Sequence, residues 1–197
     1  DSHAPRRATA GFLSVNPGAA HMHRRAVVVG ACSLATVGCV DRLHDLAAST
    51  PRDLGVRSRY VDGNPLVEGR SVLDRPAEII THAASFRSSA AAKGSLRPDA
   101  AETRAFVDST AFVDDGGEAV LVVAQRLTAP EVELRLGAIS RTGDHSLRIA
   151  VDQTGVRGEI DPDEPVVKTL LLRLTDERGP PKRIVVSIDG DRAGVTV

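Results

Sequence analysis

The chain has 197 residues, of which 26% are charged and 42% hydrophobic, and its formal net charge is −1. This length suits one domain with a substantial core, and the ordinary composition argues against a chain that is disordered throughout. The near-neutral charge and the few aromatic residues (four Phe, one Tyr, no Trp) argue against a nucleic-acid-binding protein and against a sugar-stacking site.

The first forty residues differ from the rest of the chain in charge. They carry four arginines against one aspartate, a net charge of +3, whereas the remainder carries a net charge of −4. A cationic front on a mildly acidic body is typical of a targeting segment.

Arg24 and Arg25 are followed at once by residues 26–37 (AVVVGACSLATV), an apolar run without charge. A bilayer-spanning helix needs about 20 apolar residues, so this run is too short to span a membrane. Its length and its basic flank are those of a secretory signal. Cys39 follows Gly38, where a signal of this kind is cleaved, and the chain has no cysteine beyond it.

Residues 22–39 resemble the leaders of twin-arginine-translocated lipoproteins, with Arg24 and Arg25 as the export signal. The resemblance implies that Cys39 is the lipid-attachment residue. It also implies that the mature protein is held at the outer face of the cell membrane by this lipid, or is secreted. The alternative is an intracellular domain in which residues 26–37 belong to the fold and Cys39 is a core thiol.

We therefore expect three segments: a disordered extension plus leader over residues 1–39, an irregular tether over 40–76, and a β-rich domain over 77–197. The tether is broken by proline and glycine, and residues 56–61 form its one candidate strand. In the domain, the first predictions are a strand at 77–81 and short helices at 85–93 and 99–108. Phe106 and Phe112 are expected to fill the core.

After residue 117 the pattern predicts strands. Residues 118–127 are almost wholly apolar, which favours a central strand, whereas the later segments alternate apolar and polar residues. These later predicted strands cover residues 132–136, 147–151, 166–174, 184–188 and 195–197. Such strands, separated by proline and glycine, predict a mainly β fold: an antiparallel β-sandwich or open barrel with one or two short helices.

Four sequence patterns in this domain are similar to known proteins. They are Phe106-x₃-Thr110-x-Phe112, Leu121-Val122-Val123-x-Gln125, TLLLRL at 169–174 and IVVSIDG at 184–190. Together they resemble uncharacterised lipoproteins of halophilic archaea and, more distantly, the C-terminal β-domain of PrcB-type accessory subunits of protease complexes. The resemblance implies a β-sandwich module without catalytic residues that acts through partners or ligands, and it carries no functional residue over to this chain.

No metal or catalytic motif stands out. His44, His82 and His145 are far apart and no zinc motif occurs. Acidic turns at 114–115, 161–164 and 189–191 are candidate calcium ligands, although such turns are usually solvated hairpin ends. Two candidate serine–histidine pairs, Ser85 with His82 and Ser146 with His145, lack a nucleophile-elbow motif.

Several arginines alternate with aliphatic residues in the predicted strands, which places them on the solvated face. They are Arg135, Arg141, Arg148, Arg157, Arg173, Arg178 and Arg183. They form either a basic stripe for an anionic partner or a mixed solvated face neutralised by interleaved carboxylates, and we favour the mixed face.

The sequence thus predicts an exported, lipid-anchored, non-catalytic accessory or binding module. Its expected partners are the membrane surface, reached through the lipid, and an unidentified protein, with no nucleic acid, metal or cofactor. The alternative is a secreted hydrolase whose site is assembled from distant Ser, His and Asp residues.

Overall fold

The computed structural model describes residues 50–155 and 166–197. The proposed export signal, Arg24 and Arg25, and the proposed lipid-attachment residue, Cys39, lie outside the described residues.

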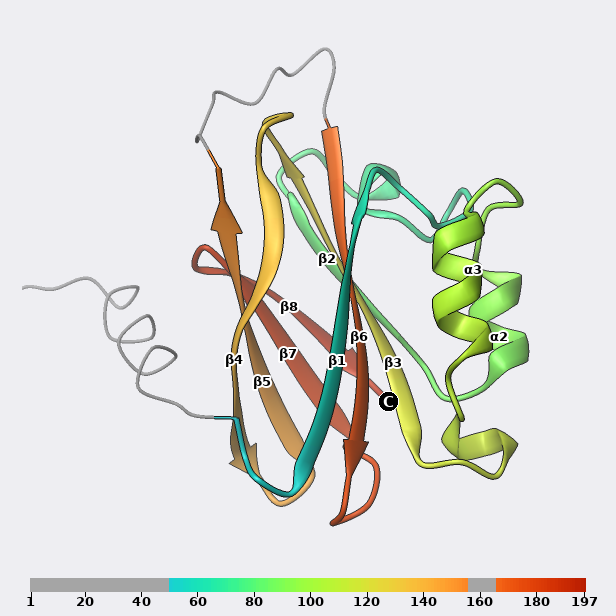
Figure 1. Ribbon diagram of the computed structural model, residues 1–197. Coiled ribbons are helices and arrows are strands. Elements are labelled where there is room, and N and C mark those ends of the chain that lie inside the picture. The colour runs from blue at the N-terminus through green and yellow to red at the C-terminus, as the bar shows by residue number, and fades with distance from the viewer. Residues whose placement is uncertain (1–49, 156–165) are drawn as a thin grey trace, which may run out of the picture. The chain divides into compact units, whose positions relative to one another are not determined.

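The described residues form a sandwich of two four-stranded sheets (Figure 1). The first sheet has the order β1 (Leu54–Asp62), β6 (Val166–Asp176), β3 (Ala119–Thr128), β2 (Thr81–Phe86). The second has the order β4 (Glu133–Gly143), β5 (Ser146–Thr154), β7 (Arg183–Ile188), β8 (Asp191–Thr196). The prediction of a mainly β sandwich is confirmed, and both sheets are open rather than closed into a barrel.

The main core lies between the sheets and is built from alternating residues, as the period-two pattern predicts. Val122 and Leu172 of the first sheet and Ile149 and Val186 of the second are fully buried in one cluster. Burying these aliphatic side chains is the main contribution to the stability of the sandwich.

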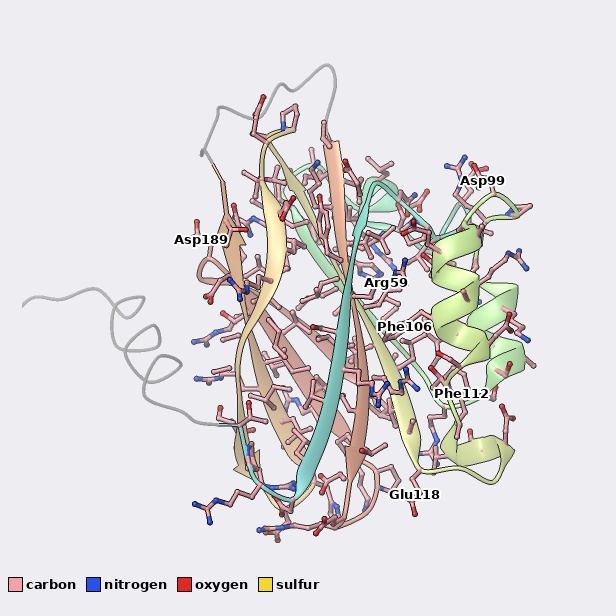
Figure 2. The ribbon with its side chains drawn as sticks, viewed as in Figure 1. Arg59, Asp99, Phe106, Phe112, Glu118 and Asp189 are labelled. Atoms are coloured by element: carbon pink, nitrogen blue, oxygen red, sulfur yellow. The ribbon has the colours of Figure 1, made fainter. Side chains whose placement is uncertain are left out.

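A second core covers the outer face of the first sheet. Two α-helices, α2 (Ser89–Gly94) and α3 (Ala101–Asp108), and two short 3₁₀ helices, η1 (Val72–Asp74) and η2 (Val113–Asp115), lie on this side (Figure 1). Phe106 and Phe112, which Figure 2 labels, are buried in this second core as predicted. Because β3 is covered on both faces, it is apolar along almost its whole length.

One strand pair departs from the predicted antiparallel arrangement. β5 and β7 pair in parallel, whereas the other strand pairs described are antiparallel. The reason is that β6, which lies between β5 and β7 in the chain, belongs to the first sheet. The chain therefore comes back to the second sheet in β7, which runs in the same direction as β5.

The predicted tether over 40–76 needs correction where it overlaps the fold. β1 pairs with β6 along nine residues, and Leu54 contributes to the core between the sheets. The folded part therefore includes residues 54–62, well before the expected boundary at residue 77.

The predictions at 77–93 were wrong in their boundaries. The strand is β2 at Thr81–Phe86 rather than 77–81, and the helix begins at Ser89 rather than residue 85. Pairing with β3 holds the alanines of β2 in an extended conformation despite their low strand propensity. Ser88 then starts the helix, because its side chain accepts a hydrogen bond from the Ala91 amide at 3.2 Å.

Candidate functional site

The serine and histidine residues of β2 lie on opposite faces of the strand. Ser85 lies on the same face of β2 as Ala83, the face that points toward the second sheet. Its hydroxyl donates a hydrogen bond to the Thr196 carbonyl at 3.0 Å. The His82 ring lies 3.1 Å from the Arg70 carbonyl on the other face. Burial and the nearby Arg75 charge lower the pKa of His82 despite that carbonyl. The two side chains therefore cannot exchange a proton directly.

The second candidate pair, Ser146 with His145, lies at the β4–β5 hairpin. The His145 carbonyl accepts hydrogen bonds from the amides of Lys182 and Arg183, at 2.8 and 3.2 Å. This backbone pairing joins the hairpin to the start of β7. Within residues 50–155 and 166–197, no serine hydroxyl is hydrogen-bonded to a histidine ring.

The acidic turns are held by protein donors. The Oδ1 atom of Asp114 accepts two hydrogen bonds from the guanidinium of Arg87, from Nη2 at 2.9 Å and from Nε at 3.0 Å. Asp115 accepts from the Ser89 amide, and Asp191 pairs with Arg126. The acidic segment 161–164 lies outside the described residues. Among the residues that the structure describes, no three His, Cys, Asp or Glu side chains are placed to hold a metal ion.

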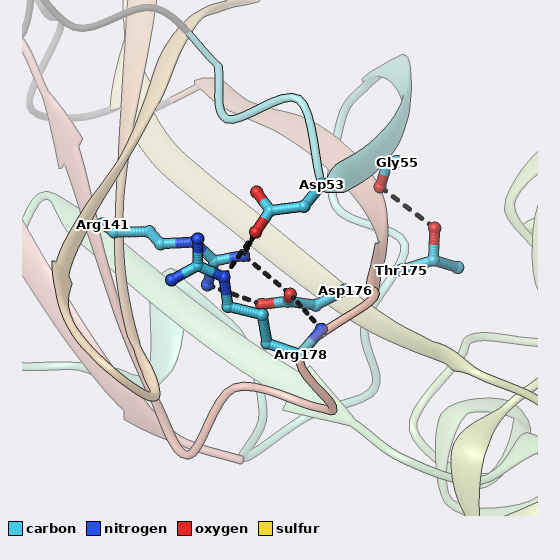
Figure 3. Close-up of polar contacts among 6 residues, drawn as sticks. All are labelled: Asp53, Gly55, Arg141, Thr175, Asp176 and Arg178. Carbon is cyan, nitrogen blue, oxygen red and sulfur yellow. Dashed lines mark hydrogen bonds and ion pairs between the residues drawn. The ribbon is translucent and has the colours of Figure 1, made fainter.

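Arg141 is not on the solvated face, which corrects the prediction. Its guanidinium makes two hydrogen bonds to Asp176, at 2.7 and 2.8 Å, and lies 3.1 Å from Asp53 (Figure 3). Arg178 also binds Asp53, so two arginines and two carboxylates form one cluster. Arg141 belongs to β4, whereas Asp176 ends β6, so the cluster joins the two sheets at one end of the sandwich.

A β-bulge explains this placement. Leu134 and Leu136 point inward, but the register shifts at Gly137, after which Ile139 and Arg141 point inward. Without that extra residue Arg141 would lie on the same face as Arg135, which points outward.

The ion pairs of this cluster shift the pKa of both carboxyl groups. The bidentate bond from Arg141 lowers the pKa of Asp176, against the opposing effect of burial. Burial alone would raise the pKa of Asp53, but hydrogen bonds from Arg178 and Arg141 hold it below its usual value. Both groups are therefore charged at neutral pH.

A second buried arginine joins the sheets at the other end. Arg126 of β3 points inward, and its Nη1 binds Asp191 at 2.7 Å, Thr81 at 2.8 Å and the Ile188 carbonyl at 2.9 Å. Its neighbour across the strands, Lys168, binds Asp62 at 2.7 Å. Sequence reasoning missed these residues, although Arg126 continues the inward parity of Val120, Val122 and Ala124, and that signal was available.

The open depressions on the described surface include three of about 370, 560 and 740 Å³. The first lies beside η1, the second between the end of β1 and the first turn of α3, and the third beside Asp53 and Asp176. The first is lined by Ser71, whose hydroxyl oxygen accepts a hydrogen bond from the Leu73 amide. None of the three is lined by a cysteine or a histidine among the described residues, so none places a histidine base beside a serine or cysteine nucleophile.

No described helix lies on the outer face of the second sheet. The described helices cover the first sheet, on the side away from β4, β5, β7 and β8 (Figure 1). Strand register places four arginines on this outer face: Arg135, Arg148, Arg183 and Arg192. Two carboxylates, Glu133 and Asp152, accompany them. We call these six residues and the small residues between them the arginine face.

The predicted arginines therefore separate into different environments. Arg135, Arg148 and Arg183 lie on the arginine face, while Arg178 is in the β6–β7 turn and Arg157 lies outside the described residues. Arg173 is on the outer side of the first sheet, where its guanidinium lies 5.1 Å from the Phe106 ring centre. Arg192, which the sequence reasoning did not include, joins the face from β8.

In the part of the chain that the structure describes, the helices are all too short or too polar to cross a membrane. Comparison of this chain with protein-family models, with curated proteins and with solved structures found no match.

Proposed function

We propose that this protein is an exported, lipid-anchored, non-catalytic module that binds a partner at the outer face of the cell membrane. The observation that carries the proposal is the order of features in residues 22–39. An arginine pair precedes a short apolar run, which ends at Cys39, and the body that follows contains no cysteine.

The folded part is compatible with this role. The first described strand begins at Leu54, so fewer than fifteen residues separate Cys39 from the sandwich. No described helix covers the outer face of the second sheet, which supports its use as a surface for a partner. Accessory modules of this type need a stable scaffold and an exposed surface rather than a catalytic cleft.

The alternative, a secreted hydrolase, receives less support. It needs a serine or a carboxylate pair beside His82 or His145. The His82 ring instead lies 3.1 Å from the Arg70 carbonyl, on the outer face of β2. His145 lies in the β4–β5 hairpin, where its own backbone carbonyl accepts hydrogen bonds from the amides of Lys182 and Arg183.

The test is membrane fractionation and intact-mass analysis of the C-terminally tagged full chain in an export-competent host. The native chain is expected in the membrane fraction, without residues 1–38 and with added lipid mass. Cys39→Ser is expected to be exported but not lipidated, and Arg24→Lys with Arg25→Lys is expected to remain inside the cell. A native chain of full length that stays soluble in the cell interior contradicts the proposal.

A further inference from the structure

We propose that the free edge of β1 binds an extended, acidic segment of a partner protein, which adds to the first sheet as an antiparallel strand. This inference rests on the proposed function, because that function requires a partner. It names the chemistry of the partner and the strand that the partner contacts, and it leaves the outer face of the second sheet available for other contacts.

β1 is the most regular open edge of the sandwich. Among the described strands, β1, β2, β4 and β8 end the two sheets. The edges of β2 and β8 face each other, since the Ser85 hydroxyl donates to the Thr196 carbonyl. The register of β4 shifts twice, and such bulges make an edge a poor template for pairing. β1, in contrast, pairs with β6 over nine residues without a shift and is the outermost strand of its sheet (Figure 1).

The backbone of β1 has unpaired hydrogen-bonding groups along this edge. The Gly63 amide donates to the Val167 carbonyl at 3.0 Å, so the odd-numbered residues of β1 form the hydrogen-bonded pairs with β6. In an antiparallel ladder the intervening residues direct their amide and carbonyl groups away from the partner strand. In the middle of β1 these residues are Val56, Ser58 and Tyr60. No described strand pairs with them on the other side, so this edge is a template for an added strand.

Two arginines face each other at the middle of this edge. Arg57 of β1 lies directly opposite Arg173 of β6, and both side chains are on the outer face of the first sheet. The Arg173 guanidinium donates to the Ser109 carbonyl at 2.6 Å and lies over the Phe106 ring, whereas Arg57 is exposed. Within the described residues, neither arginine has a carboxylate partner. Like charges directly opposite each other are unfavourable, so a carboxylate beside them is attracted to both.

A third arginine extends this positive charge along β1. Arg59 lies on the same face as Arg57 and pairs with Glu102 of α3 at 3.0 Å, with side chains 42% and 71% exposed. Glu102 is thus the one carboxylate that is ion-paired with these three arginines among the residues described. Asp53 and Asp62 lie at the two ends of β1, so the part of the strand that attracts a carboxylate is its middle.

The same charges oppose pairing of β1 with a second copy of this chain. Two copies related by a twofold axis at Ser58 would pair in antiparallel register through the unpaired backbone groups. This arrangement would place Arg57 of each copy opposite Arg59 of the other, which is repulsive. A strand that carries carboxylates at these positions has no such conflict, so the edge discriminates between the two partners.

The test titrates the full chain, with Cys39→Ser so that no lipid is attached, with synthetic peptides of about eight residues. The test peptide is threonine throughout except for two glutamates, two positions apart, in its middle. In two matched peptides the glutamates are replaced by glutamines or by lysines. NMR chemical-shift changes measure the affinity. We expect the glutamate peptide to bind about tenfold more tightly than the glutamine peptide, with the difference falling as salt rises, and the lysine peptide to bind most weakly.

A backbone-modified peptide separates strand addition from simple attraction between charges. N-methylation of the threonines that alternate with the glutamates keeps both carboxylates but removes the amides that would pair with β1. We expect this peptide not to bind. With the unmodified glutamate peptide, hydrogen exchange of the Val56, Ser58 and Tyr60 amides is expected to slow, while exchange in β8 stays unchanged.

A charge reversal tests the role of Arg57. Arg57→Glu is expected to bind the lysine peptide more tightly than the glutamate peptide, which reverses the order of the parent. The matched control is Arg183→Glu, at an exposed arginine on the outer face of β7 in the other sheet. This control is expected to bind both peptides as the parent does.

A proline substitution tests the backbone of the edge. The Ser58 amide points away from β6, so Ser58→Pro removes a group needed for strand addition without removing a hydrogen bond to β6. This variant is expected to lose binding of the glutamate peptide although Arg57 is still present. Thermal unfolding monitored by circular dichroism checks that each variant is folded, and sedimentation is expected to show that the parent chain is a monomer.

Four results would overturn the proposal. They are equal binding of the glutamate and glutamine peptides, full binding of the N-methylated peptide, binding unchanged by both Arg57→Glu and Ser58→Pro, or a parent dimer that Ser58→Pro dissociates. The last result would assign the edge to a second copy of the chain. Failure here is distinct from failure of the proposed function, because a native chain that is exported and lipidated but whose Cys39→Ser form ignores the peptides keeps its anchor and loses only this contact.

Discussion

At the scale of single residues, two inward-pointing arginines join the sheets where most inward positions are aliphatic. Arg141 reaches from the second sheet to Asp176 and Asp53 of the first, and Arg126 reaches from the first sheet to Asp191 of the second. Burying such a charge is costly unless it is paired. Arg141 is paired with two carboxylates, although its Nε has no hydrogen-bond partner, and Arg126 binds a carboxylate, a hydroxyl and a carbonyl.

The Arg141 pair gives a direct prediction of stability. Arg141→Met keeps most of the side-chain volume but leaves Asp176, whose side chain is only 2% exposed, without its bidentate partner. We expect the free energy of unfolding to fall by about 3 kcal/mol. Urea denaturation monitored by circular dichroism measures this change.

The control is an exposed ion pair of similar length. Lys93 and Asp108 lie 2.6 Å apart, with side chains 45% and 58% exposed. Lys93→Met is expected to cost less than about 1 kcal/mol. If Arg141→Met and Lys93→Met lowered the free energy of unfolding equally, the buried ion pair of Arg141 with Asp176 would contribute no more to stability than an exposed pair.

At the scale of secondary-structure elements, strands with strict alternation were predictable and local exceptions were not. Leu147, Ile149 and Val151 alternate in the sequence and are all buried in β5. The bulge at Gly137 has no comparable signal, because a single extra residue is visible only through pairing with β5. It moved Arg141 inside and so changed the charge expected on the surface.

The arginine face shows the same limit. Sequence alternation placed Arg135, Arg148 and Arg183 opposite the aliphatic residues, which is correct. Whether they meet on one surface depends on strand order, and the parallel pairing of β5 with β7 depends on β6 joining the other sheet. Long-range pairing of this kind leaves no local pattern in the chain.

The turn before β3 gives a prediction at this scale. A Cβ added to Gly117 would lie 2.3 Å from the Ala111 carbonyl oxygen, which accepts hydrogen bonds from the amides of Glu118 and Ala119. The clash is with backbone, so Gly117→Ala is expected to destabilise the protein by about 2 kcal/mol. Thermal and urea unfolding measure the change.

Gly94, the last residue of α2, is the matched control. An added Cβ there meets no atom within 4 Å, and alanine favours the helix. Gly94→Ala is expected to raise the free energy of unfolding by about 0.5 kcal/mol. A Gly117→Ala variant whose free energy of unfolding did not fall would contradict the close approach of Gly117 to the Ala111 carbonyl.

At the scale of the whole molecule, the two ion-pair clusters lie near opposite ends of the sandwich. Lys168, the neighbour of Arg126, and Asp176, the partner of Arg141, are eight residues apart on β6, which is about 26 Å along a strand. The apolar core between them supplies most of the stability, and the clusters fix how the sheets are placed against each other at either end.

The Arg141 cluster and His82, which lies outside both clusters, also determine how stability changes with pH. The pKa values of Asp53, Asp176 and His82 are all lower in the folded protein than their ordinary values. In each case the folded state binds fewer protons than the unfolded state, so the free energy of unfolding decreases as pH falls. The contribution of His82 is present above about pH 6.5 and is lost below it, and that of the carboxylates is lost below about pH 4.

We therefore expect two separate losses of stability on acidification, measured by urea unfolding between neutral pH and pH 3. His82→Gln is expected to remove the loss of stability near pH 6 and to leave the loss below pH 4, because Asp53 and Asp176 do not contact His82. Asp176→Asn is expected to lower stability at neutral pH and to reduce the loss below pH 4. A profile that is flat over this range, or that rises on acidification, would mean that these groups are not held in their charge states by the fold.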